Sequence, residues 1–130
     1  MLVHTSPLHN QDVVFDKAAL MRHVDNDPEL LRDIVNLFLE SAPPLLADMR
    51  GAIARVDAPA LFEAAHALRG SARNFYAHGV EEAALTLELM AQKGFFMDAQ
   101  KAYRVLEDAV EQLSSQLRTM PRGDAAGRSL

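Results

Sequence analysis

A histidine and two arginines share one side of a segment whose residue spacing predicts a helix. The segment reads Ala65-His66-Ala67-Leu68-Arg69-Gly70-Ser71-Ala72-Arg73. At about 100° per residue, Leu68 falls in one arc with the apolar residues one turn before and after it, and that arc is expected to face a core. His66, Arg69 and Arg73 fall on the opposite, outer side, together with Phe62 and Gly70.

These side chains suit the acceptance of a phosphoryl group. A neutral imidazole is a nucleophile with an unperturbed pKa near ~6.5, so His66 is available to react at cellular pH. Arg69, one turn away, can attract and orient phosphoryl oxygens through charge-assisted hydrogen bonds. Gly70 removes a side chain beside the imidazole, which allows close approach of another molecule. Ser71 either bonds back to a carbonyl one turn earlier or contacts the phosphoryl group.

Helices must position these residues, because the rest of the chain also repeats apolar residues at helical spacing. The expected helices span about residues 16–23, 26–41, 43–56, 57–75, 79–93 and 97–120. Pro43 disfavours helical geometry in the residue before it, so the 26–41 helix is expected to stop there. Together these helices predict an all-α fold. The last four of them predict an antiparallel up-and-down four-helix bundle, and the two additional N-terminal helices are expected to cover one end of it. In the last helix Ala102, Val105 and Leu106 are among the positions expected to face inward.

The amino-acid composition limits the classes of function that the chain can have. The chain of 130 residues suits one domain, expected at 14–120 between a flexible N-terminal arm (1–13) and a disordered tail (121–130). It has no cysteine, and its net charge is −5, from 13 Lys+Arg against 18 Asp+Glu. A mildly acidic chain without a basic cluster is a poor candidate for binding nucleic acid or an anionic membrane. No apolar run approaches the ~20 residues of a membrane span, so a cytoplasmic location is expected.

The segment around His66 resembles the signature of the histidine-containing phosphotransfer (HPt) domain family. The positions that match are Ala65, His66, Leu68, Gly70, Ser71, Ala72, Phe75 and Ala77, and further matches follow at Val80, Leu87 and Glu88. Upstream, the run Asp27-Pro28-Glu29-Leu30-Leu31 and Phe38 resemble the family's first long helix, so the resemblance covers roughly residues 15–117. Two positions depart from the family pattern: Arg69 stands where Lys is usual, and Tyr76 where Gly is usual.

The resemblance implies a phosphorelay carrier. A receiver domain's phospho-aspartate would donate to His66, and the phospho-imidazole would pass the group to another receiver domain. The implied partners are response-regulator receivers and a hybrid sensor histidine kinase, with Mg²⁺ on the receiver and no cofactor or metal on this chain. The carrier would have no kinase or ATPase activity, in keeping with the absence of a Gly-rich phosphate loop. We expect a monomer.

Two other functions stay open. The first is a non-catalytic adaptor that binds receivers or kinases without carrying phosphate, for which Tyr76 leaves room. The second is a metal enzyme inside the bundle, which would need inward Glu and a Glu-x-x-His motif that the apolar inward positions do not offer. An ordinary solvated helix face is the simpler interpretation of Arg73, and Arg69 has the alternative of pairing with Glu63 or Glu82. Candidate docking residues are Phe62, Arg73, Tyr76, Leu20 and Met21. Phe62, Leu20 and Met21 have the alternative of a place at the rim of the core.

Overall fold

The computed structural model describes residues 14–120, and this part of the chain is helical, with no strand. The helices are α2 (Lys17–His23), α3 (Pro28–Arg55), α4 (Ala58–Arg73), α5 (His78–Lys93) and α6 (Ala99–Thr119). None of these helices is long and apolar enough to cross a membrane. The all-α prediction is confirmed, whereas the predicted arm (1–13) and tail (121–130) lie outside the described residues.

Aspartate side chains cap the first turn of three of these helices. The carboxylate of Asp16 accepts a hydrogen bond from the backbone N–H of Ala19 at 2.9 Å, and that of Asp57 accepts from Ala60 at 3.1 Å. Asp27 accepts from the backbone N–H groups of the second and third residues after it, at 3.0 and 3.3 Å. Each cap satisfies donors that have no partner inside the helix, which explains where α2, α3 and α4 start.

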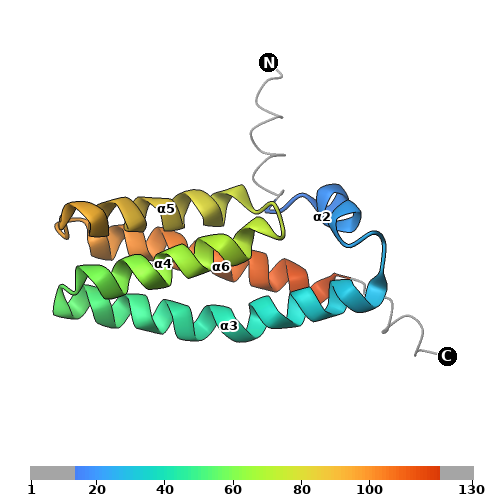
Figure 1. The fold of residues 1–130 in the computed structure, drawn as a ribbon, viewed down its shortest axis with the longest axis horizontal. Coiled ribbons are helices and arrows are strands. Elements are labelled where there is room, and N and C mark those ends of the chain that lie inside the picture. The colour runs from blue at the N-terminus through green and yellow to red at the C-terminus, as the bar shows by residue number, and fades with distance from the viewer. Residues whose placement is uncertain (1–13, 121–130) are drawn as a thin grey trace, which may run out of the picture.

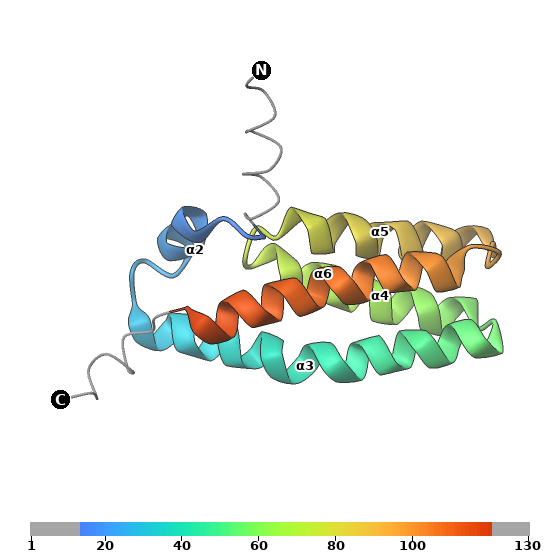
Figure 2. The same ribbon diagram turned by 180° about the vertical axis from the view of Figure 1, so that it is seen from behind.

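The predicted break before Pro43 is wrong, because α3 continues through Pro43 and Pro44 as one helix. Both prolines lie on the exposed side, where water can reach the carbonyl groups that lose their N–H partner. Phe38 and Ala42 before them and Met49 after them are all buried in the same core. Tertiary packing on both sides therefore offsets the local cost, and α3 bends partway along its length (Figure 2).

Four helices, α3 to α6, lie side by side as the bundle (Figure 1). Each packs against the next along the chain, and α6 closes the ring against α3. Short connections join them, so neighbouring helices run in opposite directions. The predicted four-helix bundle is confirmed, but residues 26–41 form the first half of α3 and are not a separate covering helix.

The short helix α2 lies at one end of the bundle, past the loop that joins α4 to α5 (Figures 1 and 2). Leu20 has no exposed surface and belongs to the core cluster, so its prediction as a docking residue is wrong. Met21 is half-buried and packs against the same core. The backbone N–H of Asp16 also bonds to the carbonyl of Phe75 at 3.2 Å, which ties the start of α2 to the end of α4.

The predicted inward face of α6 is correct at Leu106, Leu113 and Leu117, which have no exposed surface, but wrong at Val105. Val105 is 58% exposed, whereas Tyr103 and Val110 are buried. Alanine and valine recur on more than one face of this segment, so periodicity alone did not exclude Val105 from the inward face.

Candidate functional site

His66 stands on the outer side of α4, near the middle of the helix. Ala65 and Leu68, on either side of it along the chain, have no exposed surface. The His66 side chain is 61% exposed. The predicted wheel placement is therefore correct for this residue: the core anchors the helix on one side and leaves the imidazole in solvent on the other.

Phe62 lies one turn before His66 and stacks on it. The ring centroids are 5.6 Å apart and the ring planes differ by 11°. Phe62 is half-buried and packs against the core with its other contacts. A ring held in this way covers one face of the imidazole and restricts its rotation. Phe62 therefore belongs to the rim of the core and to the surface beside His66 at once.

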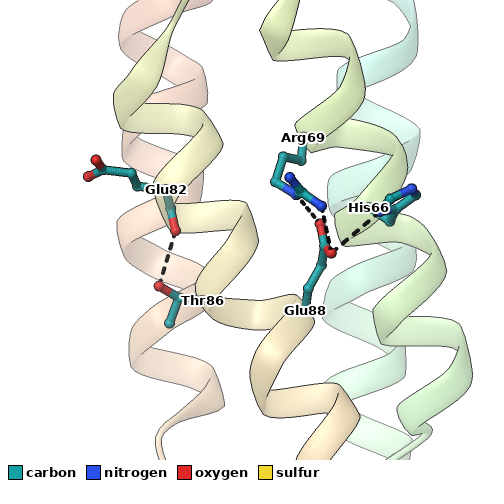
Figure 3. A network of polar contacts seen from close by, with 5 residues as sticks. All are labelled: His66, Arg69, Glu82, Thr86 and Glu88. Carbon is teal, nitrogen blue, oxygen red and sulfur yellow. Dashed lines mark hydrogen bonds and ion pairs between the residues drawn. The ribbon is translucent and has the colours of Figure 1, made fainter.

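A buried carboxylate from α5 joins the imidazole to the nearest arginine (Figure 3). Glu88 Oε1 lies 3.4 Å from His66 Nδ1 and accepts a hydrogen bond from Arg69 Nη2 at 3.1 Å. Arg69 Nε also donates to Glu88 Oε2. The guanidinium and the carboxylate thus form a bidentate ion pair, and the His66 ring contacts Oε1, one of the two oxygens in that pair.

The side chain of Glu88 is only 5% exposed, while that of Arg69 is 22% exposed. Burial raises the pKa of Glu88, but hydrogen bonds from Arg69 and His66 outweigh burial and hold this pKa below its ordinary value. In turn, the hydrogen bond to Glu88 raises the pKa of Arg69 above its ordinary value. The carboxylate is therefore ionised at neutral pH, and the pair carries one charge of each sign.

Sequence reasoning did not select Glu88 as a site residue, although it placed Glu88 among the family-pattern matches. A usable signal existed, because Glu88 falls among the buried residues Ala84, Leu87 and Ala91 of α5. An acid in an apolar stripe needs a partner. Arg69 pairs with neither of its suggested partners, Glu63 and Glu82. In this region Glu82 contributes only its backbone carbonyl, which accepts a hydrogen bond from the Thr86 hydroxyl (Figure 3).

Three further predicted residues lie on the same helix as His66. Gly70 is exposed, and a Cβ added there would meet no atom within 4 Å. The surface beside the imidazole is therefore open at Gly70. Ser71 is half-buried and Arg73 is exposed.

Tyr76 lies outside the network around His66. It follows the end of α4 with a φ of 55°, a left-handed conformation that glycine adopts at no steric cost. Its ring packs edge-on against His23 with centroids 6.3 Å apart. The departure from the family's usual glycine therefore coincides with a backbone position that favours glycine, and the ring contributes to the end of the bundle near α2.

The fold and the site together define a helical bundle that presents one exposed histidine. The sequence model of the Hpt domain matches residues 33–116, most of the chain, and the chain belongs to the Hpt domain family. It is thus a histidine phosphotransfer protein of the phosphorelay class, and such domains are phosphocarriers rather than kinases.

One solved structure with the same fold is the histidine-containing phosphotransfer protein B (HptB) from Pseudomonas aeruginosa PAO1. The TM-score is 0.76 at 19% sequence identity, over 81% of this chain and 91% of that one. No curated protein matches the sequence significantly.

Proposed function

We propose that His66 accepts a phosphoryl group from the phospho-aspartate of one receiver domain and passes it to the aspartate of another. The observation that carries the proposal is the exposed His66 imidazole, held by Phe62 and Glu88 on a domain of the Hpt family. Of the other histidines in residues 14–120, neither His23 nor His78 has both a stacked ring and a buried carboxylate against it.

The accepting atom is Nε2. Glu88 engages Nδ1, so the other ring nitrogen is the one left to react. The lone pair of Nε2 attacks phosphorus, the bond between phosphorus and the aspartyl oxygen breaks, and the aspartate leaves as a carboxylate. Return transfer to a second receiver reverses these steps. In both directions the receiver supplies the Mg²⁺ that neutralises the phosphoryl oxygens.

Arg69 supports the phosphoryl group while remaining paired with Glu88. A guanidinium carries five N–H donors, and Glu88 receives two of them. The remaining donors are available to the oxygens of a phosphoryl group bonded to Nε2 of His66. Gly70 leaves the surface next to the imidazole open to the receiver's active site. Phe62, Met21, Arg73 and Tyr76 are the docking candidates that the structure leaves at least partly exposed.

The proposed partners are therefore response-regulator receivers and a hybrid sensor histidine kinase, met by a monomeric carrier in the cytoplasm. Nucleic acid is not a proposed partner, because the net charge is −5.

A phosphotransfer assay tests the proposal. Wild type, His66→Gln and His78→Gln are each mixed with a pre-phosphorylated receiver domain from the same organism and Mg²⁺. His78 is a matched control, because it is also exposed and also lies beside an acid, with its Nδ1 3.5 Å from Glu81. We expect an acid-labile, base-stable label on wild type and on His78→Gln and none on His66→Gln. A label that survives in His66→Gln contradicts the proposal, and receivers that bind wild type without labelling it favour the adaptor function.

A further inference from the structure

The His66 imidazole has two different neighbours on its own helix. Phe62, one turn before it, stacks on the ring, with the centroids 5.6 Å apart and the planes differing by 11°. Gly70, one turn after it, has no side chain, and a Cβ added there would meet no atom within 4 Å. Side chains of an α-helix lean toward its N-terminus, so the imidazole leans onto the turn that carries Phe62. One face of the ring is therefore covered, while the surface toward Gly70 is open.

The core holds Phe62 in place, so that its ring can act as a fixed surface. Leu61, its neighbour in the chain, has no exposed surface, and Phe62 itself is half-buried against the core cluster. The His66 side chain, by contrast, is 61% exposed. The last torsion of a histidine side chain has broad energy minima, so an exposed imidazole changes orientation easily unless its neighbours restrain it. The stacked ring of Phe62 restrains the plane of this imidazole.

Phosphoryl transfer between two docked proteins depends on that orientation. The lone pair of Nε2 must meet phosphorus in line with the aspartyl O–P bond, so that the N–P bond forms as the O–P bond breaks and the aspartate leaves as a carboxylate. In the docked complex the position of the phospho-aspartate is fixed, so only those ring orientations that direct Nε2 at phosphorus react. A small phosphoryl donor in solution has no such constraint, because it can reach Nε2 from any open direction.

We propose that Phe62 is a positioning residue, whose stacked ring holds the plane of the His66 imidazole so that Nε2 meets the phosphoryl group of a docked receiver domain. This inference rests on the proposed function of His66. It also differs from the role of Phe62 as a docking candidate. A docking contact changes how tightly the receiver binds, whereas a positioning residue changes how fast the bound complex reacts.

The size of the effect follows from the strength of an aromatic pair. Stacking of two rings favours the stacked arrangement by a factor of about two to ten over its alternatives. Loss of the Phe62 ring should therefore lower the population of the reactive imidazole orientation by about the same factor. The rate of transfer within the docked complex should fall in proportion.

The first test observes the His66 ring directly and needs no phosphoryl transfer. Proton NMR measures the ring-current shift of the imidazole protons in wild type, Phe62→Leu and Phe62→Tyr. We expect the shift in wild type and in Phe62→Tyr, which keeps an aromatic ring, and its loss in Phe62→Leu. A wild-type imidazole without a ring-current shift would overturn the inference.

The second test measures transfer from a pre-phosphorylated receiver domain over a range of receiver concentrations. Phe96→Leu is the matched control, because Phe96 is also half-buried against the core but lies between α5 and α6. For Phe62→Leu we expect a maximal rate about two- to tenfold lower at an unchanged half-saturating concentration. Phe62→Tyr should restore most of the maximal rate, and Phe96→Leu should match wild type.

Two results of this second test contradict the inference. An unchanged maximal rate with a raised half-saturating concentration would make Phe62 a docking contact. An equal fall of the maximal rate in Phe96→Leu would make the effect a general loss of packing. Far-UV circular dichroism checks that each variant is folded, and Phe62→Met replaces Phe62→Leu if the latter is not.

A third test separates this inference from the proposed function. Each protein is labelled with phosphoramidate, a small donor that does not dock. Because a small donor does not require one ring orientation, we expect Phe62→Leu to be labelled on His66 at the wild-type rate. An equal slowing with phosphoramidate and with the receiver would show that Phe62 acts on the reactivity of the imidazole, and the positioning role would fail. If wild type is not labelled on His66 by either donor, the proposed function itself fails.

Discussion

Val56 offers a stability prediction whose size follows from its backbone conformation. It ends α3 in the left-handed region, with φ 54° and ψ 48°, and its side chain lies in solvent, with the residue 64% exposed. A left-handed conformation costs a residue with a Cβ roughly 1–2 kcal/mol, and a β-branched side chain is especially unfavourable there. Glycine avoids this cost and is the usual residue at this position of a helix end.

Replacing Val56 with Gly should therefore stabilise the fold. Glycine also reduces stability by about 0.4–1 kcal/mol, because it increases the conformational entropy of the unfolded chain. Little packing is lost, because the Val56 side chain is mostly exposed. The net gain expected is about 1 kcal/mol, or about 4–8 °C in melting temperature for a domain of this size.

Urea and thermal unfolding followed by far-UV circular dichroism measure this change. Val56→Ala is the matched control, because it removes the same exposed side-chain atoms but retains the Cβ that is strained in the left-handed region. We expect the Gly variant to be more stable than the Ala variant by about 1 kcal/mol. An Ala variant as stable as the Gly variant would refute the reasoning, since backbone strain would then not be the cause.

The remaining predictions concern the site and its support. His66→Gln should change the free energy of unfolding by no more than about 0.5 kcal/mol, because the side chain is 61% exposed. Leu68→Ala should cost about 2–5 kcal/mol, because Leu68 has no exposed surface. Urea unfolding of both variants checks this pair, and equal losses would mean that the faces of α4 are wrongly assigned. Glu88, whose pKa is lowered in the fold, should stabilise it fully at neutral pH, and that contribution should be lost as the pH falls below the ordinary value of 4.5 through the lowered pKa. Glu88→Gln should therefore lose less stability than wild type between pH 6 and pH 3, and parallel losses would show that the ion pair contributes nothing.

Local rules predicted the helices well where one residue decides the outcome. The capping aspartates Asp16, Asp27 and Asp57 begin helices because the hydrogen bonds they accept lie within three residues along the chain. The helix expected to end at residue 93 does end there, and Gly94 follows it with a φ of 67°. Where these helices begin and end depends on residues that are close along the chain, so the sequence alone is enough to predict it.

The same kind of rule failed at Pro43. The preference of the residue before proline against helix is local, and α3 overrides it with core contacts from Phe38, Ala42 and Met49. Leu20 was a candidate docking residue and is instead buried where α2 meets the end of the bundle. Both outcomes depend on contacts between residues far apart in the chain.

The sequence alone determined that His66 is exposed beside Arg69 and Gly70, because a helical period and the apolar residues around it suffice to orient one helix. Only the tertiary structure decided that Arg69 pairs with Glu88 and that Glu88 also reaches Nδ1 of His66. That pairing depends on α5 being the neighbour of α4 and on how far each helix is shifted along the other. Periodicity within a single helix carries no information about either, so the contacts that the proposed reacting histidine makes with its neighbours follow from packing.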